Sequence, residues 1–309
     1  MRYLVVGAGA LGGYFGGRLL EAGRDVTFLL RPGRAKALAS TGLVVKSRFG
    51  DLSIATPPFV LADGIAGPFD VVIVGCKAYD LAGTMDSFAP AVGPDTAILP
   101  VLNGMRHLDD LQGRFGAARV LGGLCMISAT LDAAGTIQHL NDLHGLVFGE
   151  LDGSVSARVE QIAADFSTAN FQSRATPLIL QEMWEKWVFI ASVAGLTCLM
   201  RASIGDIVAA GATELNLRMV DECCAIAAAN GFAPRPPSVE RIRSGVTAAG
   251  SPMAASMLKD LERGAAVEAD HVLGDLLARS GERAQALSLL RVAYLHLKAY
   301  EARRAAAAK

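Results

Sequence analysis

The sequence predicts an α/β protein, in which a doubly wound parallel sheet with helices is followed by an all-helical part. The first 175 residues alternate short apolar runs with amphipathic stretches, which is the pattern of βα units. Beyond Pro177 the strand pattern ends, and apolar residues recur at helical spacing. A chain of 309 residues is also longer than one hydrophobic core usually serves. We therefore expect two domains, residues 1–175 and 176–309.

Strands and helices of the first part follow from its apolar runs. The clearest helix covers residues 11–22, and alternation predicts a hairpin from tracts 136–140 and 145–149. A closing helix is expected over residues 154–169, with Ser154 as its N-cap. The predicted strands are residues 3–6, 26–30, 71–75, 97–102 and 120–127.

The second part is expected to contain only helices. The apolar run 187–200 is shorter than the roughly 20 residues that span a bilayer, so it predicts a buried core helix. Prolines after Gly231 break the helical series. The predicted helices are residues 182–200, 214–230, 238–248, 253–263, 267–279 and 284–303.

Composition excludes several classes of partner. The 29 basic and 30 acidic residues give a net charge of −1, without the positive field that attracts nucleic acids. The five cysteines form no CxxC pair and have no histidine at metal-ligand spacing, which favours buried free thiols over a metal site. Glycines interrupt the first apolar run, unlike a signal peptide. We expect a cytoplasmic protein without a nucleic-acid or membrane partner.

A glycine motif stands where the first strand meets the first helix. The run LVVGAGALGG places Gly7, Gly9 and Gly12 in a GxGxxG, the fingerprint of a Rossmann-type dinucleotide site. Gly7 permits a tight turn, Gly9 leaves room for a pyrophosphate, and Gly12 lets the helix approach the strand. The phosphates would bind at the helix N-terminus. The predicted cofactor-binding loop consists of Gly7, Ala8, Gly9, Ala10, Leu11 and Gly12.

The residue at the end of the second predicted strand indicates whether the site binds NAD or NADP. NAD sites place an acid at its end to bind the ribose 2′-hydroxyl, but this strand ends in Arg31. A guanidinium matches a 2′-phosphate in charge and geometry, and Arg34 stands near enough in sequence to support it. The sequence therefore favours NADP(H) as the cofactor.

Two further residues follow buried strands at the edge where such sheets bind ligands. Lys77 comes directly after the strand VVIVG, and a contact with a phosphate or carboxylate would suit it. Asn103 follows the strand ILPVL and could meet the nicotinamide ribose or the substrate. Asn103-Gly104 is also an ordinary turn signal, and spacing alone leaves that choice even.

Together these residues carry a resemblance to the ketopantoate reductase family, the 2-dehydropantoate 2-reductases, over nearly the whole chain. Members reduce the ketone of 2-dehydropantoate to pantoate with NADPH, a step of pantothenate biosynthesis, and have a Rossmann domain followed by a helical domain. The motifs that carry the resemblance are GAGALG, CKAYD around Lys77, LNGM around Asn103, EMWEKW around Lys186, GLTCL, and SMLKD from Ser256 with Glu268 downstream.

The resemblance implies roles for residues that spacing alone would leave unassigned. It makes Lys186 the general acid, because an ammonium can protonate the oxygen that becomes negative when hydride attacks a ketone. It places Ser256 and Asn103 on the substrate, and Glu268 on the cofactor and against the lysine. Without it, Ser256 would be an ordinary helix residue and Glu268 a surface charge. Lys77, Asn103 and Ala129 complete the cofactor-binding set.

The substrate wall departs from the family pattern. Family members present two asparagines to the substrate, four and eight residues after the lysine, but here these substrate-contacting positions are Ile190 and Ala194. Two lost hydrogen bonds, at roughly 1 to 3 kcal/mol each, would weaken recognition by tens to thousands of fold. An alternative substrate is therefore a related, less polar 2-oxo acid.

Two other functions remain open at this stage. A non-catalytic NADP(H)-sensing protein would keep the nucleotide site, but it would have no use for Lys186, Ser256 and Glu268. A 3-hydroxy acid dehydrogenase of the 6-phosphogluconate dehydrogenase type would share the domain plan and use a lysine. The sequence leaves monomer and homodimer both open.

Overall fold

The structure, a computed structural model, describes residues 1–281 and 286–307. The chain divides into two compact units. The N-terminal unit contains Met1–Leu102 and His107–Ile179, and the helical unit contains Asn103–Arg106 and Leu180–Lys309. The short segment Asn103–Arg106 thus groups with the helices although it follows a strand of the sheet.

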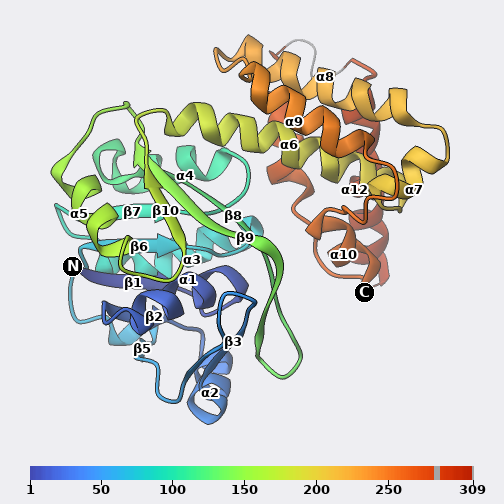
Figure 1. The fold of residues 1–309 in the computed structure, drawn as a ribbon. Coiled ribbons are helices and arrows are strands. Elements are labelled where there is room, and N and C mark those ends of the chain that lie inside the picture. The colour runs from blue at the N-terminus through green and yellow to red at the C-terminus, as the bar shows by residue number, and fades with distance from the viewer. Residues whose placement is uncertain (282–285, 308–309) are drawn as a thin grey trace. The chain divides into compact units, whose positions relative to one another are not determined.

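Five parallel strands form the main sheet of the N-terminal unit, in the order β5-β2-β1-β6-β7 (Figure 1). The order runs outward in both directions from β1, and ligands of such sheets bind at the carboxyl ends where it reverses. The predicted fold class is confirmed, and four predicted strands lie within two residues of their expected limits. The strands are β1 (Arg2–Val6), β2 (Asp25–Leu29), β5 (Phe59–Val60), β6 (Val71–Val74) and β7 (Ala97–Pro100).

Helices connect these strands, and α1 (Ala10–Glu21) matches the predicted helix 11–22. The other helices of this unit are short. They are α2 (Pro32–Thr41), α3 (Leu81–Phe88), α4 (Arg106–Phe115), α5 (Ala157–Phe166), and the 3-10 turns η1 (Ala62–Gly64), η2 (Ala78–Asp80), η3 (Ala89–Ala91) and η4 (Ala117–Arg119).

A second sheet contains a long antiparallel ribbon of β8 (Leu121–Leu131) and β9 (Ile137–Glu150). The predicted hairpin of tracts 136–140 and 145–149 is wrong, because residues 137–140 and 145–149 belong to one strand, β9, whose antiparallel partner is β8. The polar residues between them form an irregularity of the ladder instead of a turn, and Asn141 Oδ1 accepts the Ser128 amide at 2.8 Å. The sheet is completed by β3 (Leu43–Lys46), β4 (Leu52–Ile54) and β10 (Gln172–Ala175).

The cap of α5 also differs from the prediction. Ser156, two residues after the expected Ser154, is the N-cap, and its Oγ accepts the Val159 amide at 3.3 Å. Ser154 instead donates its amide to Asp152 Oδ1 at 2.9 Å, which forms the preceding turn. The closing helix therefore starts later than the sequence indicated.

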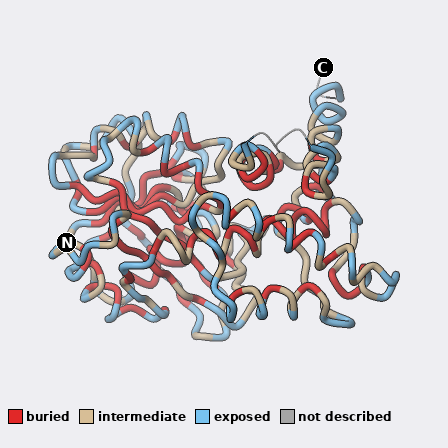
Figure 2. The backbone as a smooth tube through the Cα atoms, turned by 90° about the horizontal axis from the view of Figure 1, so that it is seen from above, coloured by how far each residue is buried: buried red, intermediate tan, exposed pale blue. Residues whose placement is uncertain are grey.

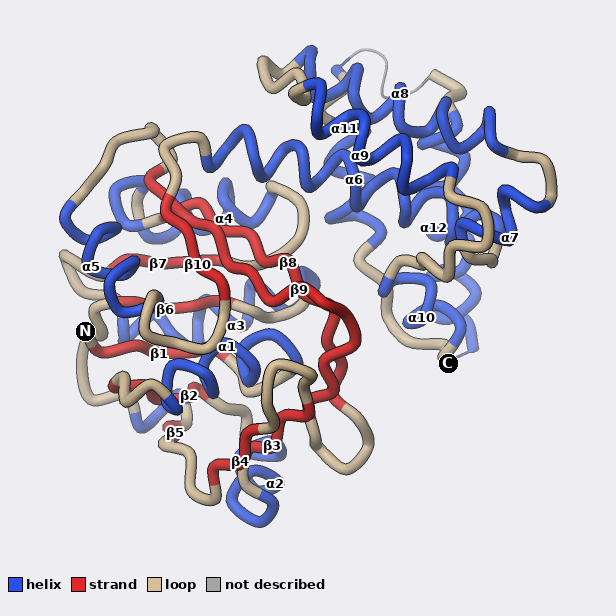
Figure 3. The backbone as a smooth tube through the Cα atoms, in the orientation of Figure 1, coloured by secondary structure: helices blue, strands red, loops and turns tan. Residues whose placement is uncertain are grey.

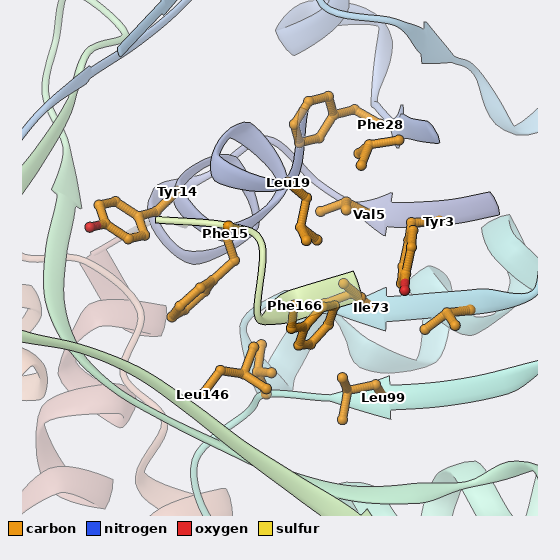
Figure 4. Packing of buried hydrophobic residues seen from close by; sticks show 14 of the residues in the cluster. Tyr3, Val5, Tyr14, Phe15, Leu19, Phe28, Ile73, Leu99, Leu146 and Phe166 are labelled. Carbon is orange, nitrogen blue, oxygen red and sulfur yellow. The ribbon is translucent and has the colours of Figure 1, made fainter. Parts of the chain in front are cut away.

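The core of the N-terminal unit lies around the main sheet and α1. Phe28, Ile73 and Leu99 of the strands are buried with Phe15 and Leu19 of the helix (Figure 4). Figure 2 shows the buried stretches of the backbone in red. This core fixes the end of β1, and with it the glycine turn that follows.

Among the described residues that follow β10, every regular element is helical (Figure 3). By length and composition α6, with 22 residues, would also suffice to cross a membrane, but 72% of its apolar window is buried inside the protein. The expected helix 267–279 begins with a π-helical turn, and residues 284–285 of the last expected helix lie outside the described residues. The elements are α6 (Ile179–Met200), α7 (Ile204–Ala209), α8 (Thr213–Ala229), α9 (Pro236–Thr247), α10 (Ser256–Glu262), η5 (Asp270–Gly274), α11 (Asp275–Ala278) and α12 (Leu289–Ala307).

Candidate active site

The glycine turn joins β1 to α1 with a backbone that other residues would disturb. Gly7 has a φ of +87°, and its amide donates to the Leu29 carbonyl of β2 at 2.9 Å. A Cβ on Gly12 would lie 2.2 Å from the Gly7 oxygen, so only glycine fits there. A Cβ on Gly9, the N-cap of α1, would meet nothing within 4 Å. The turn is therefore close-packed on its strand side and open at Gly9.

The first turn of α1 offers amide groups to an anion. Ala10, Leu11 and Gly12 are its first residues, and the first amides of a helix have no intrahelical acceptor. The N-cap Gly9 carries no side chain that could accept them. These donors, with the helix dipole and the open space at Gly9, fit a pyrophosphate.

Arg34 forms a hydrogen bond to the backbone of the glycine turn. Its Nε donates to the Ala8 carbonyl at 3.0 Å, and its Nη2 donates to the Gly135 carbonyl in the β8–β9 turn at 3.4 Å. Burial lowers the pKa of Arg34. In the structure this side chain braces the backbone of the loop, a use that the sequence did not suggest.

Arg31 stands at the N-cap of α2, exposed, and forms an ion pair with Asp80. The distance from Arg31 Nη2 to Asp80 Oδ1 is 3.3 Å. Asp80 belongs to the connection that follows β6, and β1 lies between β2 and β6 in the sheet. The pair therefore joins the two connections on either side of the glycine turn. Reasoning from the sequence did not single out Asp80, although it stands within the CKAYD motif.

Lys77 and Ala129 are both partly buried in the N-terminal unit. Lys77 is the N-cap of η2, and its carbonyl accepts the Asp80 amide at 2.9 Å. Ala129 pairs with His139 where the β8–β9 register shifts. Such irregularities commonly redirect side chains next to binding sites.

Lys186, Ile190 and Ala194 follow each other at four-residue intervals on α6 and therefore lie on one side of this helix. Lys186 and Ile190 are partly buried, and Ala194 is 1% exposed. Trp184 and Trp187, beside the lysine, are 2% and 1% exposed. Lys186 is thus a partly exposed residue on a helix that is otherwise largely buried.

Ser256 is tied to the same helix through Thr197. Thr197 Oγ1 donates to the Val193 carbonyl at 2.7 Å and accepts the Ala255 amide at 3.3 Å. Ala255 is the N-cap of α10, so this bond fixes the point at which Ser256 begins its helix. Sequence reasoning missed Thr197, although the GLTCL motif contains it.

Glu268 precedes the turn η5, and its carbonyl accepts the Val272 amide at 2.9 Å. The Val272 carbonyl in turn accepts the indole Nε1–H of Trp187 at 2.9 Å, in a buried position. Glu268 and the turn of α6 that carries Lys186 are therefore connected by two hydrogen bonds.

Comparison with known families decides the class of protein. Residues 3–153 match the family described as "Ketopantoate reductase PanE/ApbA", and residues 178–301 match "Ketopantoate reductase PanE/ApbA C terminal". The chain belongs to the ketopantoate reductase family. It is an oxidoreductase of this family, and the resemblance noted from the sequence is confirmed.

Relatives of the ketopantoate reductase family cover nearly the whole chain. An uncharacterized oxidoreductase of Bacillus subtilis, YkpB, is 38% identical over 98% of this chain and 99% of its own. A 2-dehydropantoate 2-reductase of Halobacterium salinarum is 30% identical over 94% of this chain and 96% of its own. A crystal structure of 2-dehydropantoate 2-reductase from Geobacter metallireducens aligns with a TM-score of 0.87 at 30% identity, covering 97% of this chain and 99% of that one.

No metal centre accompanies this site in residues 1–281 and 286–307, where His, Cys, Asp and Glu side chains form no group of three able to hold an ion.

Proposed function

We propose that this ketopantoate reductase family member uses NADPH to reduce 2-dehydropantoate to pantoate. The observation that carries the proposal is the glycine turn, with its open N-cap at Gly9 and its free amides, in a chain of this family. The Halobacterium salinarum relative, named a 2-dehydropantoate 2-reductase, supports the substrate. In this proposal residues 1–175 bind the nucleotide, and residues 176–309 supply the acid and the substrate wall.

The chemistry assigns one role to each group of residues. A bound NADPH supplies a hydride for the 2-keto carbon. The first amides of α1 hold the pyrophosphate, and Lys77, Asn103 and Ala129 flank the rest of the nucleotide. Lys186 donates a proton to the carbonyl oxygen as negative charge develops there, and the amine regains a proton from water. Glu268 orients the ammonium, and Ser256 binds the substrate.

Arg31 supports the preference for NADPH over NADH. Its exposed guanidinium at the start of α2 stands where the adenosine ribose is expected to lie. The partner it holds, Asp80, is an anion, as a 2′-phosphate is. The nucleotide phosphate would take the place of the carboxylate.

A second candidate substrate is a less polar 2-oxo acid. Ile190 and Ala194 supply only carbon to the side of α6 that carries Lys186. Such a wall favours a substrate with a more apolar side chain, because it leaves no buried polar group in need of a partner.

A substrate panel tests the proposal. NADPH oxidation is followed with 2-dehydropantoate and with 2-oxo acids of increasing apolar size, and kcat/KM is compared. A wide preference for 2-dehydropantoate supports the first substrate, and a preference for a bulkier acid supports the second. NADPH binding without oxidation by any acid would favour the sensing function instead. Turnover of 3-hydroxy acids in the oxidative direction would favour the 6-phosphogluconate dehydrogenase type.

Buried thiols support a reducing compartment. Cys125, Cys198 and Cys223 are buried, and burial raises the pKa of the Cys198 and Cys223 thiols to about 12. Such thiols are unreactive and persist reduced in the cytoplasm. We place the enzyme there.

A further inference from the structure

The π-helical turn η5 lies among the candidate catalytic segments of the helical unit. Its backbone widens so that the Asp275 amide donates to the Asp270 carbonyl, five residues back. Turns of this kind are rare, and many occur at functional sites. Glu268 stands two residues before it and is bonded to it through the Val272 amide.

The turn contacts the segment that carries Asn103. Gly104, the next residue, has a φ of +77° and packs against His271 of the turn. A Cβ on Gly104 would lie 3.0 Å from both the His271 carbonyl oxygen and its ring Cδ2. Since one of these atoms is backbone, the contact leaves little room for adjustment. The position of Asn103 is therefore set against η5.

The turn also contacts the segment that carries Lys186. Trp187 is 1% exposed and donates its indole N–H to the Val272 carbonyl of the turn. The next residue along α6 from Lys186 thus makes a directed, buried contact with η5. Replacing this indole by an apolar ring would leave the Val272 carbonyl without its donor.

Two residues of α12 also contact the turn η5. Tyr294 donates its hydroxyl to Asp270 Oδ1 at 2.7 Å, and Lys298 donates to Asp270 Oδ2 at 2.9 Å. The Tyr294 ring also lies against Gly274, where a Cβ would be 3.0 Å from its Cε2. Both ends of η5 are therefore fixed by one tyrosine.

We propose that η5 sets the relative positions of Asn103, Lys186 and Glu268, with Gly104 and Trp187 as the positioning residues. The catalytic consequence rests on the proposed function. Each of the three candidate residues lies within two residues of a position that contacts η5. A displacement of this turn would therefore move the acid and its partners together, while the glycine turn of the other unit keeps its own structure.

The variant Gly104→Ala tests the first contact. It adds a methyl group against His271, and kcat should fall between about 10- and 100-fold, as small displacements of catalytic groups cause, while KM for NADPH, whose phosphates are proposed to bind at the glycine turn, changes by a smaller factor. Gly211→Ala is the matched control, because Gly211 has a similar φ of +84° but its Cβ would meet nothing within 4 Å. Equal kcat values for the two variants would overturn the proposal.

The variant Trp187→Phe tests the second contact. It keeps an aromatic ring and removes the N–H, so kcat should fall by about 10-fold or more with KM for NADPH nearly unchanged. Trp184→Phe, which replaces the neighbouring buried indole of α6, is the control and should keep wild-type kcat. A wild-type kcat in Trp187→Phe contradicts the positioning role.

A spectroscopic readout separates this inference from the proposed function. The chain has two tryptophans, so a ¹⁵N-labelled sample gives two indole signals, and Trp184→Phe assigns them. Gly104→Ala should shift the Trp187 signal, because both contact η5, and Gly211→Ala should leave it in place. A shift in a protein that reduces no 2-oxo acid refutes the proposed function but keeps η5 as the connection. An unmoved signal in an active enzyme refutes the connection alone.

Discussion

The glycine turn and the α6 wall are built in opposite ways. The turn consists of six consecutive residues from Gly7 to Gly12, held by the end of β1 and the start of α1. The α6 wall is the proposed set of Asn103, the α6 residues from Lys186 to Ala194, Ser256 and Glu268, which come from four separate segments. The first site is a property of local sequence, and the second is a property of packing.

This difference changes what a substitution can do. In the turn, an added atom acts on the backbone it belongs to, or on the bound nucleotide. In the wall, residues outside the proposed substrate contacts, such as Thr197 and Trp187, bond to the backbone of the segments that carry the candidate residues. Substitutions in each site should show how far the two can be disturbed separately.

Removal of the acid should give the largest effect. Lys186→Ala is expected to lower kcat by about 10²- to 10⁴-fold, the usual contribution of a general acid, because no ammonium then protonates the developing oxyanion. NADPH affinity, measured by fluorescence titration, should change little, since the nucleotide phosphates are proposed to bind at the glycine turn. Lys46→Ala, which removes an exposed lysine paired with Asp51, is the control for an altered charge.

A loss of NADPH affinity in Lys186→Ala as large as its loss of kcat would show that the two sites are not separable. Undiminished turnover would exclude Lys186 as the acid.

Two glycines of the turn should respond differently to the same methyl group. Gly12→Ala places a Cβ 2.2 Å from the Gly7 oxygen and should cost about 1–3 kcal/mol of folding free energy or more. Gly9→Ala should leave the melting temperature unchanged, because its Cβ meets nothing and its φ of −83° suits any residue. It should instead weaken NADPH binding by about 10-fold, through crowding of the pyrophosphate.

Thermal unfolding and NADPH titration of both glycine variants decide the matter. If Gly9→Ala bound NADPH as well as the wild type, the pyrophosphate would not lie at this turn.

The same contrast explains what the sequence could predict. Strands β1, β2, β6 and β7 and the glycine turn are encoded by neighbouring residues, so apolar periodicity and one motif were sufficient. The partner of β9 was not predictable in this way. Residues 141–144 look like a turn by composition, but they lie inside β9 at the point where its register with β8 shifts, and Asn141 Oδ1 accepts the Ser128 amide of β8 there.

The candidate wall was predictable only through family resemblance. Lys186, Ser256 and Glu268 have no spacing that would relate them, because α6, α10 and η5 meet only after folding. The π-helical turn η5 could not be predicted from the sequence, since one wide turn hardly alters the apolar pattern of residues 267–279. The Arg31–Asp80 pair was missed because its partners follow different strands.

A polar residue at position 190 should raise the catalytic efficiency with 2-dehydropantoate. Ile190→Asn restores one asparagine of the family pattern at a partly buried position, which tolerates the change. One neutral hydrogen bond of about 1 kcal/mol should raise kcat/KM for 2-dehydropantoate roughly 5-fold, and more if the partner is charged. Ile190→Leu, equal in size and apolar, should leave that ratio unchanged. A fall in kcat/KM with the asparagine would show that the wall is adapted to an apolar substrate.

The smallest effect is expected at the exposed ion pair beside the glycine turn. Asp80→Asn removes the anion that pairs with Arg31, so NADPH should bind about 2- to 5-fold more tightly. This factor corresponds to the free energy that an exposed ion pair usually contributes. NADH, which lacks the 2′-phosphate, should show no such gain. Arg31→Leu should have the opposite effect on NADPH, and salt should reduce both changes because the side chains are exposed. If both variants altered NADH and NADPH binding equally, Arg31 would not contact the 2′-phosphate. Residues other than those that follow β2 would then have to determine any preference for NADPH.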